Sequence, residues 1–346
     1  MKACKLGYVV VTDYVKANTG KDVSDALQKL ILANPNRTIF FPDGEYVIAK
    51  PICTPANPKN SVMLELSNYA VIKAADGWND TEAMIRLGAA EPYNDIDVNG
   101  SNYGIRGGII DGNGVAKGIS IDSGRETRIE KVSIKHVFMG IHVKYGANNR
   151  SSDADILDVN IVGNDKIGSI GVLIEGCDNT LTNMRMASFQ IGVKILAPSQ
   201  FLRNVHPLYI FRGELESEEA YRDSYGFWDD TKHQCWYNNC YSDQFSNGFR
   251  MRDGARHTYS DCFCFWYSEK GTYQNGFVAD GRFNSVIRNC NVQPKPHESV
   301  KAALLLVKEK GGNGRVESPI ASDEKMTDKT YLEYLKGEVI ENIIQA

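Results

Sequence analysis

The chain has little of several features that mark other classes of protein. Its 346 residues contain only eight cysteines, and none of these lies in a Cys-x-x-Cys or Cys/His metal-binding spacing. So few cysteines do not make a disulfide scaffold, and their spacing does not predict a zinc site. We therefore expect no metal and no cofactor. The net charge is only −4, which gives no reason to expect a nucleic-acid partner.

Long hydrophobic runs are also absent from the sequence. No apolar run approaches the length that crosses a bilayer, so we expect no membrane partner. The N-terminal "MKACKLGYVVVTDY" has too short an apolar patch for a signal peptide. A complete chain would therefore stay in the cytoplasm, whereas a chain whose leader had been trimmed would be secreted.

What the chain does have is a repeat. Three stretches that begin at Gly226, Gly248 and Gly276 each open with Gly-Phe and each reach a cysteine fourteen residues later. The wider motif of glycine, apolar, any and apolar residues is typical of a strand with one buried face. Its glycines are 22, 31, 21, 34, 22 and 28 residues apart: Gly118, Gly140, Gly171, Gly192, Gly226, Gly248 and Gly276.

A second column follows these glycines. In each repeat a polar residue, usually Asn or Asp, precedes a small or medium apolar residue. Asn and Asp tolerate the left-handed backbone, so we expect a ladder at one turn of successive coils, with the apolar partners stacked inside. We expect Cys240, Cys262 and Cys290 to be buried hydrophobes in this column. The pairs are Lys131-Val132, Asp158-Val159, Asn183-Met184, Asn204-Val205, Asn239-Cys240, Asp261-Cys262 and Asn289-Cys290.

The N-terminal region predicts a cap for such a solenoid. The segment "KDVSDALQKLILANPNRTIFFPDGEYVI" contains an amphipathic helix, with Asp22 as its N-cap and Pro35 as its stop. A helix here would cover the unpaired strand edges of the first coil. Its apolar face consists of Val23, Ala26, Leu27, Leu30 and Ile31.

The order of helix, "TIFFPDGEYVI", "GIRGGIIDGNG" and glycine-led coils resembles the pectate lyase-like superfamily of right-handed parallel β-helix proteins. This superfamily includes polygalacturonases, pectate lyases, fructan-converting transglycosylases and phage tail-spike proteins. The resemblance covers roughly residues 8–310. It implies an all-β fold, a solenoid of about ten coils with an N-terminal capping helix.

The chain is expected to form a single domain over residues 1–346. Residues 1–50 would hold the cap and the first strands, 51–310 the coils, and 311–346 a partly helical C-terminal extension. The catalytic pattern of the polygalacturonases does not transfer, because no Gly-His-Gly is present and the Asp-Asp pair follows its glycine instead of preceding it. No catalytic residue is therefore carried over from the superfamily.

Along the glycine-led strands every second side chain should point outward. These side chains would form the floor of a substrate cleft, with the inserted loops as its walls. An exposed tryptophan among charges suits a sugar ring, although Trp228 could instead be packed under the loop at 208–224. His142 could equally be a surface histidine. The residues expected to bind substrate are Trp228, Arg250, Arg252, Lys194, Lys144 and His142.

Three carboxylates are the predicted catalytic groups. Glu175 and Asp230 lie two coils apart, roughly 9.6 Å, close to the carboxylate spacing of inverting glycosidases. Asp229 occupies a position that is apolar in other coils, so either the strand is distorted there or Asp229 turns into the cleft. Asp230 could instead have a purely structural role, in a salt-bridge ladder with Arg252 and Asp280.

These groups favour glycoside hydrolysis or transglycosylation on an oligo- or polysaccharide. The runner-up is a lyase acting on a uronic-acid polymer, since cations on the same floor could neutralise the uronate. A third interpretation is a non-catalytic glycan-binding or virion spike protein that forms a homotrimer.

Overall fold

The computed structural model describes residues 7–91, 103–145, 151–268, 270–271, 273–295, 301–309, 311–317, 320–321 and 344–345. The chain divides into two compact units. Unit 1 comprises Met1–Asn164 and Val172–Thr180, and unit 2 comprises Asp165–Gly171 and Leu181–Ala346. The single domain expected over residues 1–346 stays a prediction. The helix expected in the C-terminal extension falls mostly outside the described residues.

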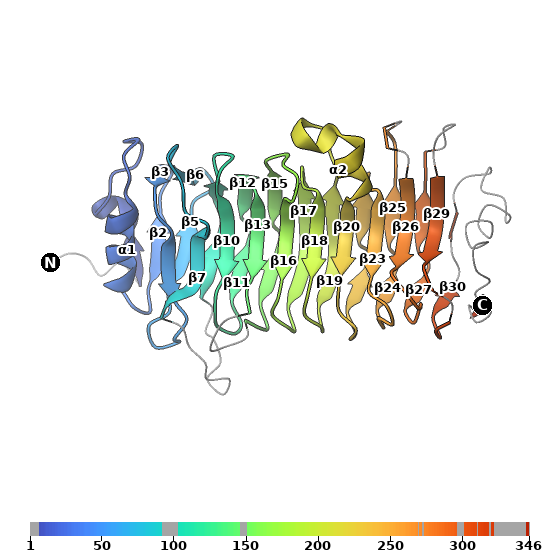
Figure 1. Ribbon diagram of the computed structural model, residues 1–346. Coiled ribbons are helices and arrows are strands. Elements are labelled where there is room, and N and C mark those ends of the chain that lie inside the picture. Colours follow the sequence, from blue (N-terminus) through green and yellow to red (C-terminus); the bar gives the residue numbers. More distant parts are fainter. Residues whose placement is uncertain are drawn as a thin grey trace. The chain divides into compact units, whose positions relative to one another are not determined.

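Unit 1 consists of three columns of parallel strands, each strand paired with the strand one coil away (Figure 1). The first column holds β4 (Ile52–Pro55), β7 (Ala83–Glu91), β10 (Lys117–Ile121) and β13 (Met139–Val143). The second holds β1 (Tyr8–Val10), β2 (Thr38–Phe41), β5 (Met63–Leu66), β8 (Gly104–Arg106), β11 (Arg128–Glu130) and β14 (Asp155–Leu157). The third holds β3 (Gly44–Ile48), β6 (Ala70–Ala74), β9 (Ile109–Asp111), β12 (Ser133–Val137) and β15 (Asn160–Gly163).

Unit 2 repeats this arrangement. Its first column holds β18 (Ile191–Ile195), β20 (Tyr225–Asp229), β23 (Asn247–Met251), β26 (Tyr273–Ala279) and β29 (Lys301–Val307). Its second holds β19 (Phe201–Leu208), β21 (Trp236–Asn238), β24 (Thr258–Ser260), β27 (Val286–Arg288), β30 (Arg315–Glu317) and β32 (Ile344–Gln345). Its third holds β22 (Tyr241–Asp243), β25 (Phe263–Phe265), β28 (Asn291–Gln293) and β31 (Ile320–Ala321). Two further strands, β16 (Ile170–Ile174) and β17 (Thr180–Ala187), contain residues of both units.

Parallel strands in successive coils confirm the predicted right-handed parallel β-helix. The strands alternate buried and partly exposed side chains, as in β6 and β12, because one face of each strand lines the coil interior. Among the described residues, no helix is both long and apolar enough to span a membrane.

The predicted polar column is confirmed at all seven positions. Its backbone φ angles lie between 50° at Asn289 and 57° at Asp261, in the left-handed region. The apolar partner that follows each one is at most 1% exposed, and Cys240, Cys262 and Cys290 are free thiols inside the coil. The side-chain amide of Asn204 donates to Asn183 Oδ1 at 2.9 Å, so the ladder also forms hydrogen bonds between coils.

The N-terminal cap is α1 (Ser24–Leu32), which ends before Pro35. The N-cap position is Val23, one residue later than predicted, but Asp22 still supplies the capping oxygen, because its Oδ1 accepts the backbone N–H of Ser24 at 2.9 Å. Ala26, expected on the apolar face, is exposed. The Gln28 side chain bonds both to the N–H and to the C=O of Cys53, so α1 satisfies backbone groups at the edge strand β4.

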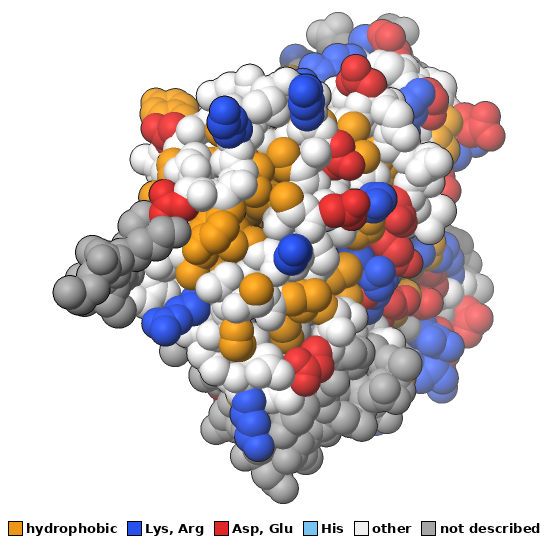
Figure 2. Space-filling model, turned by 90° about the vertical axis from the view of Figure 1, so that its left-hand side faces the viewer, with side chains coloured by type: hydrophobic (Ala, Val, Ile, Leu, Met, Phe, Trp, Pro, Cys, Tyr) orange, Lys and Arg blue, Asp and Glu red, His pale blue; other side chains and the backbone are white. Residues whose placement is uncertain are grey.

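The end of unit 1 that carries α1 presents charged side chains of both signs around small hydrophobic patches (Figure 2). The other helical segments are two short 3₁₀ helices, η1 (Val11–Asp13) and η2 (Gly213–Glu216), and the α-helix α2 (Glu218–Arg222). In unit 2, η2 and α2 belong to one long insertion with an apolar cluster of its own: Tyr209, Leu215, Ala220, Tyr221 and Phe245.

The left-handed corner generates a stability prediction. A β-branched side chain is strained at positive φ, so Asn239→Val should lower the free energy of unfolding by about 1–2 kcal/mol. Asn238→Val is the matched control, because Asn238 is the exposed neighbour on strand β21 and extended backbone favours valine. Urea unfolding monitored by circular dichroism measures both. Equal losses in the two variants would contradict the role assigned to the corner.

Candidate functional site

The sequence-predicted site residues fall into both units. His142, Lys144 and Glu175 belong to unit 1, whereas Asp230 belongs to unit 2. The separation predicted for Glu175 and Asp230 therefore stays a prediction. Unit 2 also holds Lys194, Trp228, Asp229, Arg250 and Arg252.

Unit 1 carries a polar cavity of about 170 Å³ on the outward side of β10 and β13. Charged groups of both signs face it, which makes it suited to a polar ligand and unsuited to an apolar one. The lining residues are Thr81, Glu82, Ala83, Lys117, Ile119, Ser120, Met139, His142 and Lys144.

Asp122 is the centre of a charged network beside this cavity. Arg86 binds its carboxylate through Nη2 at 2.5 Å and through Nε at 3.2 Å, and Lys144 Nζ lies 3.2 Å away. The Ser120 hydroxyl also donates to Asp122, and Lys144 pairs with Glu82. Burial raises the pKa of Asp122, but the hydrogen bonds from Arg86 and Ser120 and the charge of Lys144 outweigh it, so the pKa is lowered. Asp122 is consequently ionised at neutral pH.

Glu175 forms a pair with His142 in the same unit. The Nε2 atom of His142 lies 2.9 Å from Glu175 Oε2. Burial lowers the pKa of His142 and exceeds the opposing effect of Glu175, so the ring is neutral at neutral pH. With its proton on Nε2, the neutral ring donates this hydrogen bond to the Glu175 carboxylate and orients it.

The coil register aligns these carboxylates. The N–H of Lys144 donates to Ile121 O, and the N–H of Glu175 donates to Val143 O. Asp122, Lys144 and Glu175 thus occupy equivalent places in successive coils, and the two carboxylates are two coils or roughly 9.6 Å apart at the backbone. This column brings two carboxylates, with a lysine between them, to one surface.

Asp122 and Arg86 were not among the predicted site residues. Asp122 occupies an outward position in the coil that begins with Gly118. Arg86 lies on β7, whose "AMIRLG" carries no leading glycine, so the repeat did not reveal that coil. The register Arg86↔Ser120↔His142 is the signal that places it there.

In unit 2 Trp228 is half-buried and has two cations over its ring. Lys194 Nζ lies 4.0 Å from the ring centroid, and Arg250 Cζ lies 4.2 Å from it. These residues are register neighbours of Trp228 in the preceding and following coils. A sugar ring that stacks on Trp228 would have to displace one of these cations, and the predicted stacking role stays a prediction. Tyr225, at the end of the 206–225 insertion, also packs against the ring at 4.9 Å.

The expected ladder of Asp230, Arg252 and Asp280 is wrong. Asp280 pairs with Arg250 and with Lys308, each at 2.6 Å. Arg252 instead donates to the backbone oxygen of Asp230 at 3.3 Å. Asp230 is exposed, and no ion pair joins its carboxylate to any residue in the described ranges.

Both explanations offered for Asp229 are wrong. β20 is not distorted, because Asp229 keeps its register with Met251, and the side chain points into the coil, where it is 1% exposed. The N–H and hydroxyl of Thr231 and the hydroxyl of Tyr237 donate to its carboxylate, at 2.9, 2.7 and 2.7 Å. These donors compensate for the lost hydration, so Asp229 can be buried but cannot contact a substrate on the floor.

Comparisons with known proteins agree with the fold. Among structures, the chain is similar to Geobacillus virus E2 ORF18, with a TM-score of 0.57 and 14% identity, covering 92% of this chain and 62% of that one. It is also similar to the tailspike protein of E. coli bacteriophage HK620 in complex with a pentasaccharide, with a TM-score of 0.58 and 10% identity, covering 92% and 64%. The chain thus spans less than two thirds of these relatives, and no curated protein sequence matches it.

A family model supplies the assignment. The model described as rhamnogalacturonase A/epimerase, pectate lyase-like, matches residues 8–206, which is more than half of the chain. This stretch contains α1 and every strand from β1 to β18, including the column of Asp122, Lys144 and Glu175. The chain therefore belongs to the pectate lyase-like family of rhamnogalacturonase A and epimerase.

Proposed function

We propose that this chain acts on an oligo- or polysaccharide and cleaves or transfers its glycosidic bonds at the cavity of unit 1. The observation that carries the proposal is the column in which Asp122 and Glu175 flank Lys144. The family assignment and the sugar-bound tailspike support a carbohydrate ligand. The cavity of about 170 Å³ is small for a drug-sized ligand and suits a single sugar unit of a longer chain.

The two carboxylates have different roles in this proposal. Asp122 cannot donate a proton, because the Arg86 and Lys144 contacts keep it ionised. It would therefore stabilise the positive charge of the oxocarbenium-like transition state and accept a proton from the attacking water molecule as general base. Glu175 would take up a proton from solvent and deliver it to the leaving oxygen, with His142 as the hydrogen-bond partner that orients its carboxyl group. A spacing near 9.5 Å favours inversion at the anomeric carbon.

The charge balance of the floor argues against elimination on a uronate. Lys144 is paired with Glu82 and Asp122, while Lys194 and Arg250 contact Trp228. Arg252, the fourth cation of the predicted floor, donates to the backbone oxygen of Asp230. All four cations therefore already have partners. A lyase remains the alternative that product analysis decides, since elimination gives unsaturated products with ultraviolet absorbance and hydrolysis gives only new reducing ends.

The third alternative is a glycan-binding spike without turnover. The similarity to a phage tailspike favours it. A glycan array combined with a reducing-end assay separates the alternatives, and light scattering tests the predicted homotrimer. Binding without any product would overturn the proposed catalysis.

Glu175 provides the most direct test of the catalytic proposal. Glu175→Gln should keep the fold and glycan binding while turnover falls by at least about a hundredfold, the usual scale for losing a general acid. Glu45→Gln is the control, because Glu45 lies on β3, in another strand column of unit 1, and pairs there with Lys73 of β6. Initial rates of reducing-end release measure both variants. Unchanged turnover in Glu175→Gln would remove Glu175 from the mechanism.

A second comparison identifies the partner carboxylate of Glu175. Asp122→Asn should lower turnover by about a hundredfold or more, whereas Asp230→Asn should leave it unchanged if Asp122 is the partner. The opposite result would restore the pair of Glu175 and Asp230 that the sequence predicts. The same rate assay, with substrate affinity determined by calorimetry, distinguishes lost chemistry from lost binding.

The lowered pKa of Asp122 also predicts a pH dependence of stability. A carboxylate with a depressed folded-state pKa stabilises the fold above the unfolded pKa of about 4, and this stabilisation is lost as the pH falls through the folded value. Asp122→Asn should therefore cost about 1–3 kcal/mol at neutral pH and much less in acid. Urea unfolding across this pH range measures it. Asp25→Asn, which alters an exposed pair with Lys50, should show a small difference at every pH.

A further inference from the structure

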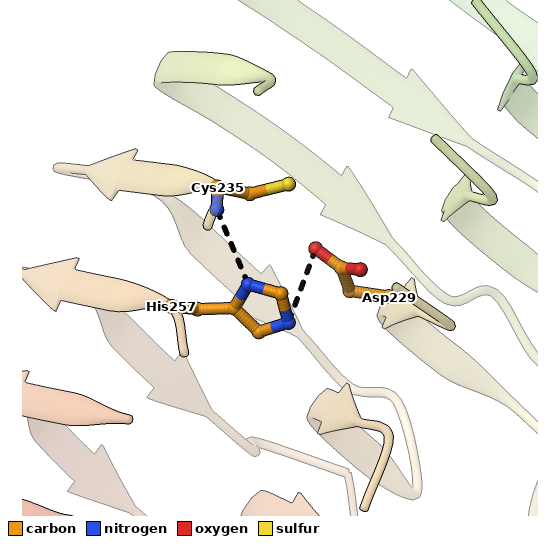
Figure 3. A group of neighbouring side chains, drawn as sticks. All are labelled: Asp229, Cys235 and His257. Atoms are coloured by element: carbon orange, nitrogen blue, oxygen red, sulfur yellow. Dashed lines mark hydrogen bonds and ion pairs between the residues drawn. The ribbon is translucent and has the colours of Figure 1, made fainter. Parts of the chain in front are cut away.

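Three side chains with metal-binding donor atoms meet inside the coil of unit 2. Asp229 ends β20, Cys235 directly precedes β21, and His257 directly precedes β24 (Figure 3). A carboxylate oxygen, the thiol sulfur and a ring nitrogen all lie within 4.8 Å of one another. All three residues are at most 1% exposed.

The carboxylate of Asp229 lacks a full counter-charge in this interior. The neighbours of Asp229 in the adjacent coils are Ile195 and Met251, so the column is otherwise apolar. Within the described parts of the chain, no lysine or arginine pairs with Asp229, and its nearest basic nitrogen is His257 Nε2 at 3.5 Å. The donors from Thr231 and Tyr237 replace the lost hydration of this carboxylate but supply no positive charge, so a bound cation would complete the site.

His257 supplies an independent observation. The N–H of Cys235 points to its Nδ1 at 3.3 Å, while its Nε2 is buried without a hydrogen-bond partner among the described residues. Figure 3 shows the Nε2 edge of the ring directed toward Asp229. Buried polar atoms are rarely left unpaired, and this one faces the same small space as the carboxylate.

We propose that Asp229, Cys235 and His257 bind a divalent transition metal, zinc in particular, inside the coil, with a water molecule as the fourth ligand of a tetrahedral site. Sulfur, nitrogen and oxygen donors together match the preferences of zinc. A thiolate and a carboxylate also cancel the two positive charges, so the occupied site is neutral in an apolar interior. The Cys-x-x-Cys and Cys/His spacing rules miss it, because its ligands come from the end of β20 and from the residues before β21 and β24, at positions 229, 235 and 257.

The three ligand atoms must move slightly closer together to bind zinc. Ligand atoms around tetrahedral zinc lie roughly 3.3–3.8 Å apart when the bonds are about 2.0–2.3 Å, so the three side chains would close by about an ångström. Thr231 and Tyr237 hold the carboxylate by hydrogen bonds, and Thr231 Oγ1 is 3.9 Å from the thiol sulfur. Such outer contacts orient metal ligands in proteins.

Two proton positions change when the metal enters. The Cys235 thiol proton passes to water, and the sulfur binds as thiolate. His257 binds through Nε2 only when its ring proton is on Nδ1, so the weak 3.3 Å contact from the Cys235 amide is given up. The loss of one long hydrogen bond is small beside the formation of three metal bonds.

Metal content tests the proposal directly. The full chain, unfolded and refolded with zinc and then dialysed, should retain about one zinc per chain by mass spectrometry. Cys235→Ser and His257→Gln should each retain less than about a tenth of that amount. Cys240→Ser is the matched control, since Cys240 is another buried thiol of unit 2 and should leave the metal content unchanged. Absence of metal from the refolded wild type, or equal loss in the control, would overturn the site.

Cobalt substitution keeps the test decisive where a variant fails to fold. The wild-type chain refolded with cobalt should show a thiolate-to-cobalt charge-transfer band and tetrahedral d–d bands, because Cys235 is a ligand. A strong chelator should also lower the thermal midpoint of the zinc-loaded chain by several degrees, since the metal binds only the folded state. A cobalt spectrum without the thiolate band would refute the assignment of Cys235.

Discussion

The structure depends on the hydrogen-bonded register between parallel strands one coil apart. This register gives every side chain the equivalent side chain of the next coil as its neighbour. Like residues therefore stack when they are apolar, as do Phe227, Phe249 and Phe277, whose ring centroids are 4.5 and 5.0 Å apart. Charged residues must alternate in sign along an outward column, because like charges directly opposite are destabilising.

The candidate site follows from the same constraint. Asp122, Lys144 and Glu175 alternate in sign along one column of unit 1. Functional groups on such a column can be separated only by whole coils, in steps of about 4.8 Å. Two steps place a cation between two carboxylates, of which one is held by Arg86 and Lys144 and the other by a hydrogen bond with His142.

The sequence predicted the backbone better than the side-chain partners. The left-handed corners at Asn204 and Asn239 were predictable because one residue and its own φ angle determine each of them. The partners of Trp228, Asp229 and Arg250 were not, because alternation along a strand gives the face of a residue but not its rotamer or its contacts across coils. Asp229 reverses even the expected face, since nearby hydroxyl donors make burial of a carboxylate feasible.

The candidate site was predictable only in part, because the position of a residue on its strand can be predicted but its contacts between coils cannot. His142, Lys144 and Glu175 were found from their place after the coil glycines. Asp122 was found as an outward residue, but its role depends on Arg86, which lies on a strand without the glycine motif. Interactions between coils carry this information, and a single strand does not contain it.

Pairing of strands one coil apart also bears on how the chain folds. The repeat glycines are 21 to 34 residues apart in a chain of 346, so the partners of each strand are close along the sequence. The corresponding relative contact order is roughly 0.06–0.10, a value more typical of helical proteins than of β-sandwiches. Each new coil can form on the exposed edge of the one before it, and α1 satisfies backbone groups at the edge strand β4 through Gln28. Growth can therefore proceed in one direction, away from the capped end.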